Sequence, residues 1–487
     1  MRLQQLIKDL DYKRLENIND CELQGISCSS RCIEPGYLFV AIKGERLDGH
    51  NFVAQAINKG AKAVILEQDV PVRSDVAKIL TGDSRIALAK VCAVFFGYPS
   101  QKLKVIGITG TNGKTTVSYL IEKILQCAGY PCGVIGTVNY RMNNKPYKKF
   151  PDWLNTTPQA DILQYFLSEI VQAKSKYAVI EVSSHALDQH RVDGVDFSLG
   201  IFTNLTREHL DYHENLENYF SCKARLFENL PQNVWAMINI DDIWGRKLVE
   251  KVQSRLLTYS IDSPAQIQAR NLRLGSSLSR FTIVSPRGDI EIETPLIGRH
   301  NVYNILAAAG AAYVENIDFN LIRLGVQACA NVPGRLESVN CGQKFSVFVD
   351  YAHTEDALKK VLTSLRQISR NRVILVFGCG GDRDKTKRPK MGRTAVELAD
   401  YVFLTTDNPR SEDPREIIAD IEEGIGKNAE NYKVVLDRFC AIEQALSVAV
   451  EGDIVVIAGK GHETTQIFAE QVITFDDREA VRKIIGT

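Results

Sequence analysis

The sequence contains no hydrophobic run that approaches the ~20 residues a helix needs to cross a bilayer, so it predicts no membrane span. It also has no excess of either charge, because 59 basic residues balance 59 acidic ones. That balance argues against nucleic acid or an anionic membrane as a partner. Residues 1–10 form a mixed-charge amphipathic segment and lack the apolar core of a signal peptide. We therefore expect a cytoplasmic monomer that acts on small molecules.

Zinc-type cysteine spacing is also missing. The eleven cysteines are scattered, and the closest pairs, Cys28 with Cys32 and Cys127 with Cys132, do not have the spacing of a zinc site. Most of these residues are expected to be buried free thiols in a reducing compartment. Low-complexity segments and long linkers are absent as well. A length of 487 residues then indicates about three domains.

A glycine-rich loop between a strand and a helix is the most informative segment. The β-branched run 104–109 predicts a buried strand, glycines stand at 107, 110 and 113, and Lys114 and Thr115 open an amphipathic helix. Backbone N–H groups, a helix N-terminus and a lysine together suit phosphate groups, and the hydroxyl suits Mg²⁺. Ile108 occupies the position where the usual pattern has glycine, which indicates a subclass of phosphate-binding loop. The alternative is a glycine-rich turn that binds nothing.

The strand and helix pattern divides the chain into three α/β segments. Residues 1–100 predict a small α/β domain, residues 101–332 a P-loop mononucleotide-binding domain with a parallel sheet plus a small antiparallel sheet at 266–296, and residues 333–487 a Rossmann-like domain. Expected strands include 36–42, 61–67, 177–182, 199–205, 234–240, 346–351, 372–377, 401–405, 433–436 and 453–458. Expected helices include 52–59, 84–96, 301–313, 355–369, 389–399, 414–424 and 438–450.

Polar residues follow two of the central strands. Glu181 ends one strand and His209 follows the next, and the carboxyl ends of parallel strands share one edge of a sheet. A carboxylate and an imidazole beside the phosphate loop could hold Mg²⁺ together with Thr115. Zinc is the alternative, because His209 and His213 would share one face of a helix. For Glu181 the other interpretation is a salt bridge at the end of a strand.

Three further segments each admit two interpretations. Lys223 lies on an amphipathic helix, where pattern alone favours a surface lysine. Asp407-Asn-Pro-Arg410 could bind a zwitterionic amino acid, since a guanidinium grips a carboxylate with two hydrogen bonds, or it could be a solvated turn. Arg383 lies in a second glycine-rich loop that would converge on the same crevice. Ser30, in Ser29-Ser-Arg31, could meet an anionic ligand or lie in a solvated turn.

Several of these motifs together resemble the Mur ligases along nearly the whole chain. They are Gly107–Thr116, Glu181-Val-Ser-Ser-His185, Thr203–His213, Asp350-Tyr-Ala-His353 and Asp407-Asn-Pro-Arg410. Folylpolyglutamate synthases share several of the motifs, whereas Asp-Asn-Pro-Arg resembles the diaminopimelate-adding branch of the Mur ligases. The alternatives are another Mur ligase, such as a lysine-adding one, a folylpolyglutamate synthase, or a non-catalytic nucleotide-binding scaffold.

The resemblance implies domains for UDP, ATP and amino-acid binding, and an ATP- and Mg²⁺-dependent amide ligase of peptidoglycan synthesis. In such an enzyme ATP phosphorylates the D-glutamyl γ-carboxylate of a UDP-muramoyl dipeptide. The amine of meso-diaminopimelate then attacks the acyl phosphate, and ADP and phosphate are released. Phosphorylation turns a poor leaving group into a good one, which agrees with the chemistry that the phosphate loop suggests.

The resemblance also implies a role for individual residues. The implied catalytic residues are Lys114, Glu181, His209 and Lys223. The implied ATP-binding residues are Gly110, Thr111, Asn112, Gly113, Lys114, Thr115, Thr116, Asn301, Arg335 and Asp350. The implied metal ligands are Thr115, Glu181, His209 and Lys223, the last as a carbamate. Residues implied for the UDP-muramoyl dipeptide are Ser30, Asn155, Thr156, Thr157, Ser183, Gln189 and Arg191. Residues implied for diaminopimelate are Arg383, Asp407, Asn408, Pro409, Arg410, Gly459 and Glu463.

Overall fold

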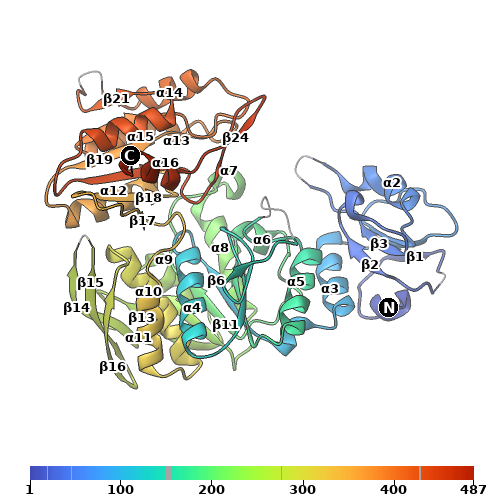
Figure 1. Cartoon of the computed structure of the whole chain (residues 1–487). Coiled ribbons are helices and arrows are strands. Elements are labelled where there is room, and N and C mark those ends of the chain that lie inside the picture. The colour runs from blue at the N-terminus through green and yellow to red at the C-terminus, as the bar shows by residue number, and fades with distance from the viewer. Residues whose placement is uncertain (19, 45–46, 150–154, 276, 427–428, 487) are drawn as a thin grey trace.

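The computed structural model describes residues 1–486 except 19, 45–46, 150–154, 276 and 427–428. The described chain forms three lobes, each built around its own sheet (Figure 1). We refer to them as the N-terminal, central and C-terminal lobes. No helix in this described part of the chain has both the length and the apolar character needed to traverse a bilayer.

The N-terminal lobe contains a five-stranded sheet in the order β1-β5-β4-β3-β2, parallel except for β1. Its elements are α1 (Leu3–Leu6), β1 (Arg14–Glu16), β2 (Gly25–Ser27), η1 (Ser30–Cys32), β3 (Tyr37–Val40), η2 (Gly49–Phe52), α2 (Val53–Asn58), β4 (Ala63–Leu66), β5 (Ala77–Leu80), α3 (Ser84–Phe95) and η3 (Pro99–Lys102). The strands predicted at 36–42 and 61–67 and the helices predicted at 52–59 and 84–96 are confirmed. Strands β1 and β5 were not predicted.

The central lobe contains an eleven-stranded sheet with β6 near its middle. Its strands are β6 (Lys104–Thr109), β7 (Cys132–Ile135), β8 (Arg141–Met142), β9 (Lys145–Pro146), β10 (Tyr177–Glu181), β11 (Leu199–Phe202), β12 (Trp235–Asn239), β13 (Arg255–Ser260), β14 (Ile267–Leu274), β15 (Ser279–Ser285) and β16 (Gly288–Thr294). Its helices are α4 (Lys114–Cys127), α5 (Ala160–Gln172), α6 (Ser184–Asp188), α7 (Leu210–His213), α8 (Leu216–Glu228), α9 (Ile243–Val249), α10 (Arg299–Val314) and α11 (Phe319–Ala328).

Alternating side chains of β6 explain why helices cover both faces of this sheet. Ile106 and Ile108 pack in one apolar cluster with α4 and α10, and Val105 packs in another with α5 and α8. Strand β6 pairs in parallel with β10 and β11, so that Ile108 lies opposite Glu181 and Thr109 lies opposite Phe202. The loops after these three strands therefore meet at one edge of the sheet.

The antiparallel part predicted at 266–296 is present as β14–β16, but it does not form a separate sheet. It continues the parallel sheet, because β13 and β14 pair through Tyr259 with Ile267 and Ser260 with Gln268. This pairing covers the edge of β13, which would otherwise expose unpaired backbone groups. Alternation along the chain could predict the hairpin but not its partner.

The C-terminal lobe has a six-stranded sheet in the order β17-β18-β22-β19-β20-β21. Its strands are β17 (Glu337–Ser338), β18 (Ser346–Asp350), β19 (Val373–Phe377), β20 (Tyr401–Leu404), β21 (Tyr432–Val434) and β22 (Ile454–Ala458), with a hairpin of β23 (Thr465–Ile467) and β24 (Val472–Thr474). Its helices are α12 (Glu355–Ile368), α13 (Lys387–Leu398), α14 (Pro414–Glu422), α15 (Arg438–Ser447) and α16 (Asp477–Ile485). The predicted strand and helix alternation is confirmed. The β23–β24 hairpin and α16 were not predicted.

Candidate functional site

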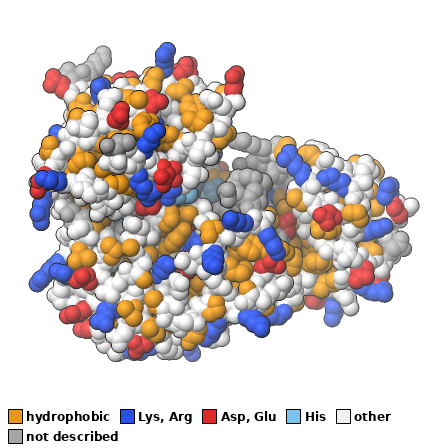
Figure 2. Space-filling model, viewed as in Figure 1, with side chains coloured by type: hydrophobic (Ala, Val, Ile, Leu, Met, Phe, Trp, Pro, Cys, Tyr) orange, Lys and Arg blue, Asp and Glu red, His pale blue; other side chains and the backbone are white. Residues whose placement is uncertain are grey.

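A cavity of about 850 Å³ lies between the central and C-terminal lobes. Its walls come from the glycine loop before α4, the loops after β11 and β18, the start of α10, and α12. In the space-filling view the surface is hollowed between the C-terminal lobe and the rest of the molecule (Figure 2). Charges of both signs are interspersed on the face that Figure 2 shows, in line with the balanced composition.

The glycine loop depends on two glycines for its shape. Gly110 and Gly113 have φ values of 144° and 92°, in the region that other residues rarely adopt. A Cβ atom on Gly110 would lie 2.0 Å from Thr203 Oγ1, and one on Gly113 would lie 2.4 Å from Asn304 Oδ1. The loop therefore needs glycine both for its backbone conformation and for the close approach of its neighbours.

The loop after β11 holds the glycine loop in place. Asn204 accepts hydrogen bonds from the backbone N–H of Thr111 (2.8 Å, to its carbonyl) and of Asn112 (3.0 Å, to Oδ1). Gly113 gives α4 no side-chain cap, and Lys114, Thr115 and Thr116 line the cavity at the start of that helix. An uncapped, positively polarised helix end at a cavity wall fits a phosphate group.

Two lysines converge on one carbonyl of this loop. Lys114 Nζ donates to the carbonyls of Gly110 and Thr111, both at 2.8 Å, and Lys223 Nζ donates to Gly110 at 2.9 Å. Burial lowers the pKa of Lys114, and burial followed by repulsion from Lys114 lowers the pKa of Lys223 far below its ordinary value. The side chain of Lys223 is 1% exposed. The surface-lysine interpretation is therefore wrong, because the amphipathic pattern of α8 could not reveal which element covers that face.

Glu181 is fully buried among hydroxyl groups. Its Oε2 accepts from Thr115 Oγ1 at 2.9 Å and from Thr137 Oγ1 at 2.8 Å, and its Oε1 accepts from Ser118 Oγ at 3.3 Å. Among the described residues these hydroxyls, and no basic side chain, are its hydrogen-bond partners, so the salt-bridge interpretation does not hold.

Glu208 is a cavity residue that sequence reasoning missed. Burial raises its pKa, but electrostatic interaction with His209, Lys114, His353 and Lys223 outweighs burial, so the net shift of the pKa is downward. It therefore carries a negative charge between the two lysines and His209. Its position after β11, directly before His209, was the available signal.

The two histidines considered for zinc contact different groups. His209 lines the cavity, and its ring centroid is 4.8 Å from that of His185. His213 instead approaches Ser184 Oγ at 2.9 Å. Across the residues that the structure describes, no three His, Cys, Asp or Glu side chains form a metal-binding group. The oxygen atoms of Thr115 and Glu208 on the cavity wall, and of Glu181 bonded to Thr115, fit the preference of Mg²⁺ better than that of zinc.

Asn301, Arg335 and Asp350 all line the cavity. Asn301 Nδ2 donates to the carbonyl of Ile297 at 2.8 Å, and its Oδ1 accepts from Asn304 at 3.0 Å. Burial raises the pKa of Asp350, and the positive charge of Arg335 partly offsets this increase. Arg335 also lies 5.0 Å from the ring centroid of Tyr351.

The residues expected to hold the UDP-muramoyl dipeptide run from the cavity toward the N-terminal lobe. Thr156 and Ser183 line the cavity, and Thr157 Oγ1 donates to the carbonyl of Glu181 at 2.7 Å. Arg191 Nη1 donates to the carbonyl of Thr157 at 2.8 Å, and its Nη2 donates to Gln189 Oε1 at 2.6 Å. The carbonyl of Asn155 accepts from Tyr140.

Ser30 is the predicted site residue that lies in the N-terminal lobe. It begins η1 in the N-terminal lobe, and its Oγ donates to Gln55 Oε1 at 2.8 Å. It is not part of the cavity lining. A ligand that touched both Ser30 and the cavity would therefore have to span two lobes.

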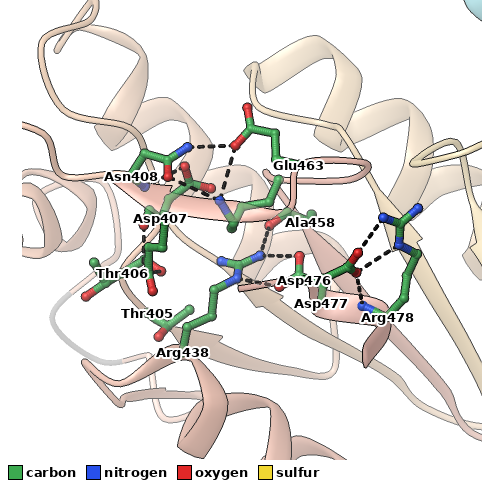
Figure 3. A network of polar contacts seen from close by, with 12 residues as sticks. Thr405, Thr406, Asp407, Asn408, Arg438, Ala458, Glu463, Asp476, Asp477 and Arg478 are labelled. Atoms are coloured by element: carbon green, nitrogen blue, oxygen red, sulfur yellow. Dashed lines mark hydrogen bonds and ion pairs between the residues drawn. The ribbon is translucent and has the colours of Figure 1, made fainter. Parts of the chain in front are cut away.

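Of the residues expected to hold diaminopimelate, Asp407, Asn408 and Glu463 lie together in the C-terminal lobe (Figure 3). Asn408 Nδ2 donates to Glu463 Oε2 at 2.7 Å, and Arg410 Nη1 donates to the carbonyl of Gly381 at 2.7 Å. A Cβ atom on Gly459 would lie 2.5 Å from Asp407 Oδ2. Pro409 is buried and Arg383 is exposed. The group adjoins the cavity through Tyr351, which lines the cavity and whose ring centroid is 5.0 Å from that of His462.

Lys460 is a second residue that sequence reasoning missed. Its side chain is 0% exposed, and its Nζ donates to Asn408 Oδ1 at 3.1 Å, to Glu463 Oε2 at 3.2 Å and to the carbonyl of Thr465 at 2.5 Å. Its place in Gly459-Lys-Gly-His-Glu463, after β22, was the only sequence signal. It joins the loop after β20 to the loop after β22.

Three family models match the chain: the Mur ligase middle domain over residues 108–312, the Mur ligase glutamate ligase domain over 334–461, and the Mur ligase family catalytic domain over 22–94. A UDP-N-acetylmuramoyl-L-alanyl-D-glutamate–2,6-diaminopimelate ligase of Clostridium perfringens is 42% identical over 100% of this chain and 99% of its own. A ligase of the same name from Syntrophomonas wolfei is 41% identical over 100% of this chain and 99% of its own.

A solved structure titled as the same kind of ligase covers 95% of each chain with a TM-score of 0.68 and 35% identity. The loops that meet at the cavity carry the motifs through which the sequence resembles this family. The chain belongs to the Mur ligase family.

Proposed function

We propose that this protein joins meso-2,6-diaminopimelate to the D-glutamyl γ-carboxylate of UDP-N-acetylmuramoyl-L-alanyl-D-glutamate, using ATP and releasing ADP and phosphate. The observation that carries the proposal is the cavity itself, which the glycine loop, Lys114 and Glu208 line. The buried Lys223 and Glu181 bond to Gly110 and Thr115 behind this lining, and the Asn408–Glu463 group lies beside it. The names of full-length relatives support the same reaction. We further propose that it acts as a monomer in the cytoplasm, where ATP is available.

The phosphate chain of ATP would lie on residues 110–116, with Lys114 turning from its carbonyl partners toward the outer phosphates. Asn301, Arg335 and Asp350 would hold the nucleoside side. Bound Mg²⁺, held by oxygen atoms such as those of Thr115 and Glu181 and by His209, would offset charge on the transferred phosphoryl group. Lys114 adds a fixed positive charge at the same place.

Lys223 has a property that a carbamate requires. A neutral amine attacks CO₂, forming a C–N bond and losing one proton, and the depressed pKa of Lys223 favours the neutral amine. The carbamate nitrogen keeps one N–H, which can still donate to the carbonyl of Gly110. The new carboxylate would convert a cation into an anion suited to a metal ion.

The two substrates would approach the cavity from opposite sides. The UDP-muramoyl dipeptide would extend from Ser30 through Gln189, Arg191 and residues 155–157 to Ser183. Diaminopimelate would bind at Asp407–Arg410, with Arg383, Gly459 and Glu463 around it. Arg410 would pair with the distal carboxylate, a group that lysine lacks. On this proposal residues 1–100 bind UDP, 101–332 bind ATP and 333–487 bind the amino acid.

The test is ADP release with ATP, the UDP-muramoyl dipeptide and a panel of amino acids. We expect release to depend on diaminopimelate, with lysine lower in kcat/KM by about tenfold or more, because an unpaired guanidinium costs about 1–3 kcal/mol. If lysine and diaminopimelate gave equal kcat/KM, Arg410 would not discriminate between them. Preference for glutamate would favour a folylpolyglutamate synthase. Binding of both ligands without ADP release would favour a non-catalytic scaffold.

A further inference from the structure

Two guanidinium groups from different lobes meet at a single amide oxygen. Arg85, in the first turn of α3, donates from Nη1 to Gln189 Oε1 at 3.3 Å. Arg191 donates to the same oxygen from Nε at 3.2 Å and from Nη2 at 2.6 Å. The contact between Arg85 and Gln189 spans 104 residues of sequence and joins the N-terminal lobe to the central lobe.

The positive charge at this junction is not balanced by the described residues. The two arginines otherwise donate to backbone carbonyls, Arg85 to that of Lys43 at 2.9 Å and Arg191 to that of Thr157 at 2.8 Å. Among the described residues, the hydrogen-bond acceptors of the two guanidinium groups are amide and carbonyl oxygens, and none of them is a carboxylate. Arg191 is only 9% exposed, and buried charges in proteins are usually paired.

Burial and the second cation both act on Arg191. Burial lowers its pKa, and repulsion from Arg85 lowers it further. A neutral amide oxygen accepts hydrogen bonds from both groups, but it cannot cancel two positive charges. Two adjacent guanidinium groups therefore favour an anion with two or more acceptor oxygens, which is what the planar guanidinium fork binds best.

We propose that Arg85, together with Arg191, binds one anionic group of the UDP-muramoyl dipeptide across the junction of the two lobes. That group is either the diphosphate or the α-carboxylate of the D-glutamyl residue, which present the same paired oxygens. The inference rests on the proposed function for the identity of the ligand. The junction continues through Thr157 to Ser183 at the cavity, because Thr157 Oγ1 donates to Ser183 Oγ at 3.3 Å. Arg85 is thus a binding residue supplied by the N-terminal lobe.

The test compares Arg85→Gln and Arg85→Lys with the parent protein, using calorimetric binding of UDP, UDP-muramoyl-L-alanine and the full UDP-muramoyl dipeptide. We expect Arg85→Gln to weaken binding of the dipeptide about 10- to 100-fold, and Arg85→Lys to restore part of that loss. KM for ATP and for diaminopimelate should change less than about twofold. The control is Arg73→Gln, an exposed arginine of the same lobe that pairs with Asp75.

The ligand series separates the two anionic groups. If the diphosphate is bound, all three ligands weaken by a similar factor. If the D-glutamyl carboxylate is bound, only the full dipeptide weakens. The inference would be overturned if Arg85→Gln bound all three ligands as tightly as the parent protein, or if KM for ATP rose by the same factor as the dissociation constant of the dipeptide. Because binding is measured directly, a protein that binds the dipeptide without releasing ADP would refute the proposed reaction and leave this inference standing.

Discussion

Replacing Lys460 by methionine tests whether the loops that would hold diaminopimelate depend on one buried cation. Methionine preserves most of the volume and the apolar stem, but it removes the three hydrogen bonds that Nζ donates to Asn408 Oδ1, Glu463 Oε2 and the carbonyl of Thr465. Asn408 and Glu463 come from different loops, as Figure 3 shows. Their relative position is what the substitution disturbs.

The free-energy cost of Lys460→Met depends on the hydrogen bonds that Asn408 and Glu463 retain after Nζ is removed. Asn408 Oδ1 retains the backbone N–H of Ile467 at 3.0 Å, and Glu463 is 30% exposed, so water can satisfy part of its carboxylate. Breaking a fully buried ion pair costs about 3–5 kcal/mol, and these retained contacts place Lys460→Met at about 2–3 kcal/mol. If half of that cost appears as misplacement of the Asn408 amide, KM for diaminopimelate rises about tenfold.

The assay measures KM for each of the three substrates, together with urea unfolding. We expect KM for diaminopimelate to rise while KM for ATP changes little. The matched control is Lys78→Met, a lysine that is 5% exposed in the N-terminal sheet and pairs with Glu16 and Asp69. It should lower stability without changing that KM. An unchanged KM for diaminopimelate in Lys460→Met, or an equal rise for ATP, would refute the reasoning.

Three other predictions concern the cavity and the C-terminal lobe. Lys114→Ala should reduce kcat about 100- to 1,000-fold while the melting temperature stays close to that of the parent, and retained turnover would contradict its role. Lys223→Ala should be inactive and partly rescued by a short carboxylic acid, whereas a fully active variant would exclude the carbamate. Hydrogen bonding with Arg388 lowers the pKa of Glu412 to about 2, below the ordinary value of 4.5. The stability this adds is present above about pH 4.5 and lost as pH falls toward 2, so Glu412→Gln should lower the unfolding free energy at pH 7 by up to about 3 kcal/mol. A deficit that stays constant between about pH 5 and 3 would contradict that assignment.

The segments that sequence reasoning located best have strong local patterns. The strand at 104–109 matches β6 residue for residue, because a β-branched run beside a glycine loop has one consistent interpretation. The strand predicted at 199–205 ends earlier, at Phe202, because Thr203 and Asn204 turn toward the glycine loop. The hairpin of β23 and β24 was missed, since its short exposed strands carry little alternation.

The site residues also fall into those that local patterns revealed and those that only the fold revealed. Gly110, Lys114 and Glu181 could be found because they stand at strand ends or in a loop of known chemistry. Glu208 and Lys460 could not be identified as site residues from the sequence, because the burial and the neighbours of a charged loop residue are known only once the fold is known. Lys223 was interpreted from α8 alone as exposed, and the glycine loop of a distant segment buries it.

By itself the sequence determined the periodic strands and helices, the phosphate loop and the family to which the chain belongs, since these depend on residues near one another in the chain. Only the tertiary structure decided which charges lose contact with water and which meet. The approach of Lys223 to Gly110, of Lys460 to Asn408 and of Arg85 to Gln189 arises between segments that no local pattern connects. Burial and distance set the energy of a charge, and both are properties of the folded chain.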